Sequence, residues 1–442
     1  MSDEAHARRN ADLDAVTQDA HQRFTAANPK SHARHEKAKA SLPGGNTRAV
    51  LWYRPFPLAF VGGSGCKVED LDGHSYTDLV SEYSAGLFGH SDAVIKAAMI
   101  SAIEGGVLLG APNDYEARYA AAIVDRFPAI ERVRFCNSGT EANIMALSAA
   151  RAITGRSKIL VFHEGYHGGV LTFAHGGSPL NLPFPFVFGD YNDIESTAAL
   201  IREHKDDLAA IIVEPMMGGG GCIVAKPEFL SFLRKQASAV GALLIFDEVM
   251  TSRLAYRGLH GALGITPDLM SLGKYLGGGA SFGAFGGRAD LMDRFDPASP
   301  NAFSHGGTFN NNILSMAAGY AGLTKVLTEE ASARVNALGD TLRGSLNAAL
   351  EKHEVGAVVI GRGSLMNLHF VAGPVETPAV LDHAPRAPLD LWHIEMLLRG
   401  QYVTPRGMLA LSLPFGQAEV DGFVDAFDDF LASFKQLLPR IA

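Results

Sequence analysis

The amino-acid sequence predicts an α/β fold: a large domain built on a mostly parallel sheet with helices on both faces, and a smaller α+β domain. Short β-rich runs alternate with segments long enough for helices through the middle of the chain. Such alternation is typical of a parallel sheet that is covered on both faces. With 442 residues, 47% of them hydrophobic, the chain is long enough for two domains around one site.

The N-terminal region, residues 1–75, predicts a helical arm followed by a hairpin. Residues 10–40 are polar and favour a helix, which "SLPGGNTR" then breaks with a proline and two glycines. The segment "CKVEDLDGHSYTDL" predicts a β-hairpin with Asp72-Gly73 at its turn. We expect so polar an arm to pack on another element or on another subunit.

The central region, residues 76–325, is expected to hold the large domain. Its β-rich runs are residues 132–136, 158–162, 209–215, 242–248, 269–273 and 282–287. Residues 326–442 then predict the smaller domain, together with the N-terminal segment. Their pattern indicates helices at 329–353, 388–400 and 418–438 and strands at 356–361, 365–371 and 408–414.

Composition excludes several classes of function. A net charge of −9 and scattered basic residues give no face for a nucleic acid. Three cysteines without a CxxC pair favour reduced thiols over disulfides or a zinc site, so we expect no metal and a cytoplasmic location. The charged N-terminus lacks the apolar core of a signal peptide, and no apolar run approaches the roughly 18 residues of a membrane span.

Unusual residues follow two of the predicted strands. Ser138, Gly139 and Thr140 open a helical segment after residue 136, where backbone N–H groups and hydroxyls predict an anion site; an ordinary helix N-cap is the alternative. Tyr166, flanked by glycines after residue 162, is a candidate to cover a planar ring, and a simple turn is its alternative.

Two further strand ends carry charged residues. Asp247 ends a run that is otherwise apolar, where a buried carboxylate needs a cationic or N–H partner; a solvent-exposed helix cap is the alternative. Lys274 follows residue 273 among apolar and glycine residues, where desolvation would make its amine a nucleophile, although a surface turn would also accommodate a lysine. Together an anion cradle, an aromatic ring, a carboxylate and an amine match the parts of pyridoxal 5'-phosphate.

These residues lie in motifs that resemble the class III pyridoxal-phosphate aminotransferases of fold type I over essentially the whole chain. The matching segments are "NSGTEAN", "YHGG", "VEPMMGG", "LLIFDEV", "PDLMSLGKYLGGG", "FGAFGGR" and "GGTFNNN". Within this family the chain is similar to glutamate-1-semialdehyde aminomutases and, more closely, to β-amino-acid transaminases of the β-phenylalanine aminotransferase type.

The resemblance implies a role for each residue of the cofactor site. Lys274 would form the Schiff base and shuttle protons, and Asp247 would pair with the pyridine nitrogen. Tyr166 would stack on the ring. The other implied cofactor residues are Ser138, Gly139 and Thr140 for the phosphate, Glu214 in the polar network, and Thr308 for the phosphate of a neighbouring subunit. The last assignment implies a homodimer with shared active sites.

Substrates that carry carboxylates call for arginines, because the guanidinium binds a carboxylate through two parallel hydrogen bonds. The resemblance implies that Arg48 holds the carboxylate of a β-amino acid and that Arg406 holds that of a keto acid, with Tyr83 in the same site. Arg54 is a competing candidate, and a salt bridge at the rim remains the alternative for all three arginines.

The expected activity is transfer of the amino group of an aromatic β-amino acid to 2-oxoglutarate or pyruvate by a ping-pong mechanism. The alternatives are a glutamate-1-semialdehyde aminomutase or another class III ω-aminotransferase. The sequence departs from the aminomutase pattern at "DEVMTSR" and "GGTFNNN". A regulatory protein that has lost catalysis is a third reading, and it predicts a missing lysine or a fused DNA-binding segment; the sequence shows neither.

Overall fold

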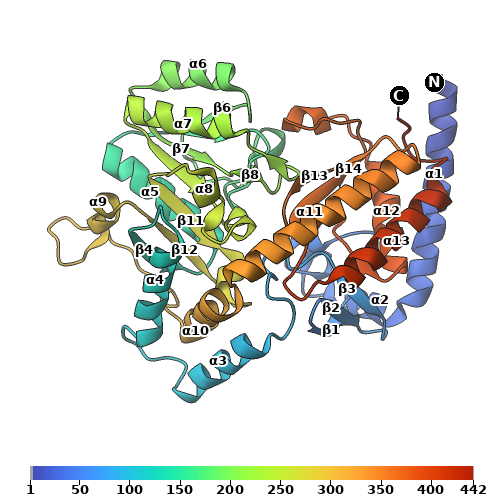
Figure 1. The fold of residues 1–442 in the computed structure, drawn as a ribbon, viewed down its shortest axis with the longest axis horizontal. Coiled ribbons are helices and arrows are strands. Elements are labelled where there is room, and N and C mark those ends of the chain that lie inside the picture. The colour runs from blue at the N-terminus through green and yellow to red at the C-terminus, as the bar shows by residue number, and fades with distance from the viewer. Residues whose placement is uncertain (1–2, 442) are drawn as a thin grey trace.

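A seven-stranded sheet forms the centre of the structure, a computed structural model that describes residues 3–441, with side chains from residue 12 onward (Figure 1). In spatial order the strands are β4 (Arg132–Cys136), β12 (Gly283–Gly287), β11 (Leu269–Gly273), β10 (Leu243–Asp247), β7 (Leu208–Val213), β5 (Lys158–Phe162) and β6 (Phe186–Gly189). The strands run parallel except β12, which is antiparallel to both of its neighbours. The expected mostly parallel α/β sheet is therefore confirmed.

Alternation of side chains along the buried strands divides the core between two layers of helices. In β10, Ile245 packs in a cluster with apolar residues of α5 (Gly139–Thr154). Leu244 and Phe246 point to the opposite face, in the cluster that contains residues of α7 (Pro227–Val240). Both faces are apolar because helices cover both, which explains why the strand sequences are continuous hydrophobic runs. The other helices of this region are α3 (Ala93–Glu104), α4 (Asp114–Arg126), α6 (Ile194–His204), α8 (Gly258–Leu263), α9 (Ala289–Met292) and α10 (Ile313–Ala321).

The antiparallel strand β12 brings its first residue to the edge where the parallel strands end. Gly283 pairs with Gly273 on one side and with Cys136 on the other. A Cβ at Gly283 would lie 2.1 Å from the carbonyl oxygen of Ser138. Glycine is therefore required there for the start of α5 to approach the sheet closely.

Smaller sheets form the other half of the molecule. They are β1 (Phe60–Ser64), β2 (Lys67–Asp70), β3 (Ser75–Asp78) and β15 (Gln401–Tyr402) in one sheet, β13 (Val358–Arg362), β14 (Leu365–His369) and β16 (Met408–Ala410) in a second, and the short pair β8 (Met216–Met217) and β9 (Ile223–Val224). The predicted hairpin is β2 and β3, whose pairing is antiparallel. Parallel pairing of β15 with β3 joins the N-terminal and C-terminal segments into one sheet.

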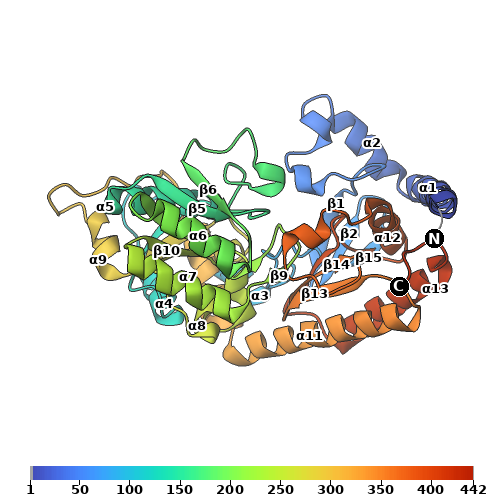
Figure 2. The same ribbon diagram turned by 90° about the horizontal axis from the view of Figure 1, so that it is seen from above.

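Long helices surround these sheets. They are α1 (Asp3–Ala27), α2 (Pro29–Ala38), α11 (Glu329–Lys352), α12 (Arg386–Leu398) and α13 (Gln417–Phe434). The N-terminal arm packs on α12, where Arg23 forms an ion pair of 2.5 Å with the buried Glu395. Figure 2 shows α1 and α2 at the opposite end of the molecule from α9. The domain boundaries at residues 75 and 325 stay predictions. Within the described residues, no helix combines the length and apolar character that crossing a membrane requires.

Candidate active site

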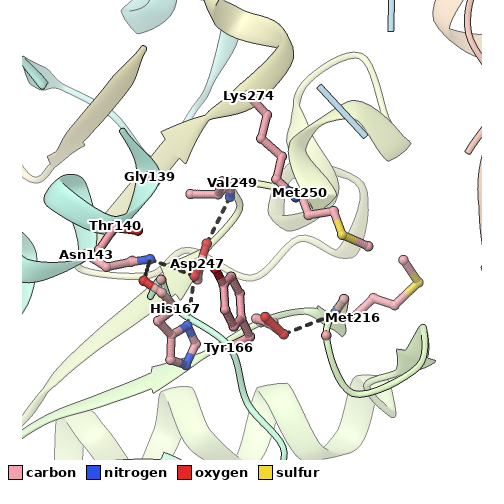
Figure 3. Close-up of a pocket in the computed structure, with 14 residues that line it drawn as sticks. Gly139, Thr140, Asn143, Tyr166, His167, Met216, Asp247, Val249, Met250 and Lys274 are labelled. Carbon is pink, nitrogen blue, oxygen red and sulfur yellow. Dashed lines mark hydrogen bonds and ion pairs between the residues drawn. The ribbon is translucent and has the colours of Figure 1, made fainter. Parts of the chain in front are cut away.

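Asp247, the last residue of β10, anchors a buried polar network at the carboxyl edge of the sheet. It lies on the same face of the strand as Ile245, two residues earlier, and therefore points toward α5. Its Oδ2 accepts hydrogen bonds of 2.8 Å from Asn143 Nδ2 and from His167 Nδ1 (Figure 3). Asn143 also donates to the His167 carbonyl oxygen and accepts from the Ser271 hydroxyl. The carboxylate is thus held in one orientation by partners from two different segments.

His167 is buried and faces the carboxylate of Asp247. Burial by itself would lower the pKa of His167, but the hydrogen bond from Nδ1 and the negative charge of Asp247 outweigh it and raise the pKa. One ring nitrogen of His167 and one carboxylate oxygen each of Glu214 and Asp247 lie within 4.8 Å of one another. Because Asp247 Oδ2 already accepts from two donors, these groups are arranged as a hydrogen-bonded network.

The start of α5 lies beside this network. Ser138 is the N-cap, and its hydroxyl accepts a 3.1 Å hydrogen bond from the Glu141 backbone N–H. Gly139 and Thr140 face the cavity, whereas Ser138 is not among the residues that line it. The first N–H groups of a helix have no partner within it and carry its positive dipole end, so this position suits an anion.

Tyr166 follows β5 and presents its ring to the cavity, with 48% of the residue exposed. Gly219 passes so close that a Cβ there would lie 2.8 Å from Tyr166 Cβ. Glu214, just after β7, is buried and accepts a 3.0 Å hydrogen bond from the Gly218 N–H. Burial, opposed by His167 and reinforced by the charge of Asp247, raises the pKa of Glu214 to about 8.

Lys274 follows β11 directly and has a left-handed backbone conformation, with φ of 56°. Its part-buried side chain extends along the cavity, and Nζ donates a hydrogen bond of 3.2 Å to the Ser84 hydroxyl. Burial lowers the pKa of Lys274 to about 8, although Asp247 and Glu214 act in the opposite direction. About a tenth of this amine is therefore neutral, and nucleophilic, at pH 7, far more than of an ordinary lysine.

These residues enclose a cavity of about 190 Å³. It is lined by Gly139, Thr140, Asn143, Tyr166, His167, Gly168, Glu214, Met216, Gly218, Gly219, Asp247, Val249, Met250 and Lys274. The groups fit pyridoxal 5'-phosphate: a helix start for the phosphate, a carboxylate for the ring nitrogen, an aromatic ring for the flat face and an amine for the aldehyde. The glycines are part of this fit, because a Cβ at Gly139 would lie 2.7 Å from Val249 Cγ1 and one at Gly168 would lie 2.3 Å from Thr140 Oγ1.

The candidate substrate residues Arg48 and Tyr83 lie together outside this list of lining residues. Arg48 forms an ion pair with Glu82, and its guanidinium lies 5.7 Å from the centre of the Tyr83 ring. Burial raises the pKa of Tyr83, whose hydroxyl donates to the Val50 carbonyl oxygen at 2.5 Å.

The other arginine candidates differ in their surroundings. Arg406 is exposed, and its charge opposes the rise in pKa of both Tyr83 and Tyr166, so it faces the same side of the molecule as the cavity. Arg54 instead lies near His21 of the N-terminal helix. Burial lowers the pKa of His21, and the positive charge of Arg54 lowers it further. Thr308 is exposed in the loop before α10 and does not line the cavity of its own chain.

Sequence patterns did not single out Asn143, Ser84 or Ser271. Asn143 lies within a helix and Ser271 within a buried strand, where a lone polar residue can just as well be structural. The one available signal was a polar residue at a position otherwise occupied by apolar ones. His167 is adjacent to Tyr166 in the sequence, and its contact with Asp247 is a result of the fold.

The chain is similar in sequence to known proteins along most of its length. The profile named "Aminotransferase class-III" matches residues 50–387. A β-phenylalanine transaminase of Variovorax paradoxus is 49% identical over 431 residues, which cover 98% of this chain and 99% of that protein. The glutamate-1-semialdehyde 2,1-aminomutase of Methanosarcina acetivorans is 36% identical over 391 residues, which cover 85% of this chain and 92% of that protein.

Solved structures agree with this similarity. A β-phenylalanine aminotransferase from Variovorax paradoxus superposes with a TM-score of 0.96 at 49% identity, covering 97% of this chain and 100% of the other. A structure of a transaminase with PLP bound superposes with a TM-score of 0.85 at 32% identity. The superposition covers 92% of this chain and 98% of the other.

Proposed function

The chain belongs to the class III aminotransferases, which use pyridoxal 5'-phosphate, and on that premise we propose that it transfers the amino group of an aromatic β-amino acid to 2-oxoglutarate or pyruvate. The end-to-end similarity to a β-phenylalanine transaminase supports the choice of an aromatic β-amino acid as the donor. The expected donor is β-phenylalanine or a close analogue. Donor and acceptor would bind in turn at one site, which therefore has to hold carboxylates of both.

The residues around the cavity have separate tasks in this proposal. Bound pyridoxal 5'-phosphate supplies an aldehyde that links to amines and a ring that accepts the electrons of the C–H bond next to the nitrogen. Gly139 and Thr140 bind the phosphate at the helix start, with Ser138 capping that helix. Asp247, oriented by Asn143 and His167, holds the proton on the ring nitrogen.

Proton transfer and ring stacking complete the assignment. Lys274 would hold the aldehyde of the bound cofactor between turnovers and, once free, would move the proton at the substrate carbon that bears the nitrogen. Its pKa of about 8, lowered by burial, lets the free amine act as a base near neutral pH. Tyr166 covers the ring face, and Glu214 keeps a proton in the buried network because its pKa is raised to about 8.

The two substrate carboxylates would be bound by different arginines. A β-amino acid has one carbon more between amine and carboxylate than an α-amino acid, so one fixed arginine does not fit both. Arg48, beside Tyr83, is assigned to the β-amino acid, and Arg406 to the keto acid. Arg54 is the weaker candidate because it faces the N-terminal helix.

Assembly as a homodimer is part of the proposal. Thr308 is exposed and is not among the residues that line the cavity of its own chain. This position is compatible with a contact to the phosphate in a second copy, as the family resemblance implies.

The decisive experiment mixes the purified protein with β-phenylalanine and 2-oxoglutarate or pyruvate and measures glutamate or alanine. We expect product with the unaltered protein and none with Lys274→Ala. Product from glutamate-1-semialdehyde without any keto acid would instead identify an aminomutase. In a panel of donors and acceptors, Arg48→Ala should raise the KM of the β-amino acid and Arg406→Ala that of the keto acid; unchanged KM values in both variants would contradict the two-arginine scheme.

A further inference from the structure

A left-handed turn of four residues that are not glycine lies beside Lys274. Ser81, Glu82, Tyr83 and Ser84 have φ values of 45°, 49°, 53° and 75°. Each such residue is unfavourable, because its Cβ comes too close to a backbone carbonyl oxygen. A run of four requires surroundings that hold it, and conformations of this kind cluster at functional sites.

The Ser81–Ser84 turn is held at both ends. At its start, Asp78 Oδ1 accepts hydrogen bonds of 2.9 Å from the backbone N–H groups of Val80 and Ser81. At its end, Arg253 Nη1 donates a hydrogen bond of 2.9 Å to the carbonyl oxygen of Ser84. The position of Ser84 is thus fixed by a side chain 169 residues away in sequence.

Arg253 is in unusual surroundings for a charged residue. Only 1% of it is exposed, and its partners are the backbone carbonyls of Ser84 and Leu411. Within the described part of the chain it forms no ion pair, and its Nε has no hydrogen-bond partner. Burying a cation without a carboxylate is costly, and an apolar residue of similar volume would avoid the cost. Retention of the charge here therefore indicates a use for it.

Ser84, at the end of the turn, contacts the amine of Lys274. Ser84 Oγ accepts the 3.2 Å hydrogen bond from Lys274 Nζ, so one residue joins Arg253, through its carbonyl oxygen, to Lys274, through its hydroxyl. Besides burial, the groups that act on the pKa of Lys274 are Asp247, Glu214 and Cys222, which raise it, and Arg253, which lowers it.

We propose that Ser84 and Arg253 are positioning residues for Lys274: Arg253 fixes the turn, and the Ser84 hydroxyl holds the Lys274 amine whenever that amine is not bonded to the cofactor. This inference rests on the proposed function, because a transaminase frees its lysine in every cycle. A freed amine on a flexible side chain has many orientations, and one hydrogen bond from a rigid turn selects the orientation next to the cavity. The uncompensated charge of Arg253 also disfavours a second cation beside it, which keeps the amine available as a base.

A chemical labelling experiment tests the contact between Ser84 and Lys274. The full-length protein is loaded with pyridoxamine 5'-phosphate, which leaves Lys274 unbonded, and treated with acetic anhydride across a pH series; modified Lys274 is counted by mass spectrometry. In Ser84→Ala we expect labelling roughly tenfold faster, as loss of a hydrogen bond to a charged group predicts. Ser81→Ala is the matched control, because Ser81 Oγ is buried in the same turn and has no partner among the described residues. Equal rates in both variants, raised or unchanged, would overturn the proposed role of Ser84.

The contribution of Arg253 is tested by charge. We expect Arg253→Met to move the labelling midpoint toward higher pH, whereas Arg253→Lys keeps it, because Arg253 is among the groups that lower the pKa of Lys274. Thermal melting of each variant checks that it folds. If Arg253→Met does not fold, the charge effect is still tested by comparing Arg253→Lys with the unaltered protein. The lysine keeps the positive charge, so the labelling midpoint should be unchanged. An unchanged midpoint in Arg253→Met, or equal shifts in both variants, would refute the charge effect.

Turnover distinguishes this inference from the proposed function. With β-phenylalanine and 2-oxoglutarate, Ser84→Ala should lower kcat while KM stays within about twofold, because Ser84 acts through Lys274 and does not contact the substrate. If the unaltered protein fails to use any β-amino acid but the labelling pattern holds, the proposed donor is wrong and the positioning role stands. A normal kcat in Ser84→Ala would refute the positioning role alone.

Discussion

At the scale of single residues, the site depends on how burial sets the protonation of Glu214. The folded-state pKa of Glu214 is raised, mainly by burial, from 4.5 to about 8. A carboxyl group with a raised pKa favours folding while it is protonated in the folded state, and this contribution is lost as the pH rises through the folded-state pKa. Between about pH 4.5 and pH 8, Glu214 therefore makes folding progressively less favourable.

Replacing Glu214 with glutamine should remove this pH dependence. Glutamine keeps an acceptor for the Gly218 N–H and has no proton to lose. We expect the melting temperature of Glu214→Gln, relative to the unaltered cofactor-free protein, to increase from pH 5.5 to pH 9 by roughly 2 °C or more. Melting curves by circular dichroism across this range measure it. A difference that stays constant with pH would show that Glu214 is ionised throughout.

Asp247 and Glu248 are adjacent buried carboxylates with different surroundings, which allows a matched comparison. Asp247 faces the cavity, whereas Glu248 accepts hydrogen bonds from the backbone N–H groups of Leu259 and His260. We expect Asp247→Asn to lower kcat by about 100-fold, or about 2.7 kcal/mol of barrier, because the ring nitrogen loses its anionic partner.

The control for Asp247→Asn is Glu248→Gln, which should lower the melting temperature and leave the kcat of the folded enzyme within about threefold. Cofactor content is measured by absorbance in both variants, so that loss of cofactor is not mistaken for loss of turnover. Similar kcat values in the two variants would mean that Asp247 has no special role in the reaction.

At the scale of elements, the contact between β12 and the start of α5 determines whether the helix end reaches the cavity. A Cβ at Gly283 would lie 2.1 Å from the Ser138 carbonyl oxygen and 2.4 Å from its carbonyl carbon, and backbone atoms do not move aside cheaply. We expect Gly283→Ala to displace the first turn of α5 and weaken binding of pyridoxal 5'-phosphate by at least about tenfold. Fluorescence titration of the cofactor-free protein measures the Kd.

A glycine in open space is the control for Gly283→Ala. Gly344 is exposed on α11, and apart from its chain neighbours and the backbone of its own helix no atom lies within 4 Å of the position that a Cβ would take. Gly344→Ala should leave cofactor binding unchanged and stabilise the protein by about 0.5–1 kcal/mol, because alanine favours helix. An unchanged Kd in Gly283→Ala would show that α5 tolerates displacement.

The sequence allowed most elements to be predicted, for a physical reason that also explains the exceptions. Strands such as β10 are covered on both faces, so their residues form apolar runs that stand out. β6 is a short, partly buried run of three apolar residues that follows Pro185, and β1 contains two glycines, so neither stands out in the sequence. The prediction for elements therefore succeeds where burial is complete.

The candidate site was predictable to the extent that each residue follows an apolar run. Asp247 and Lys274 satisfy this condition. Asn143 and Ser84 do not, and each acquires its place through a contact with a residue distant in sequence, 104 residues away for Asn143 and 190 for Ser84. Such contacts arise from the packing of the sheet against the rest of the chain, and no local pattern encodes them.

At the scale of the whole molecule, the remaining question is whether the active site is shared between two copies of the chain. Thr308 lies outside the cavity of its own chain and is exposed, as a residue that serves a second copy would be. In that case a chain with an altered Lys274 still supplies a normal Thr308 to its partner. A chain with an altered Thr308 likewise keeps a normal Lys274. Two inactive variants should then complement each other.

Mixing the two variants tests this directly. Thr308→Asp places a negative charge against the phosphate, and Lys274→Ala removes the amine, so each homodimer should be inactive. If Thr308 acts across the interface, the site that contains Lys274 in a mixed dimer receives its threonine from the other chain and works. Random reassociation makes about half of the dimers mixed, each with one working site, so roughly a quarter of the unaltered activity should return. Co-expression with two affinity tags isolates the mixed dimer, and its failure to regain activity would place Thr308 in the site of its own chain or in no site.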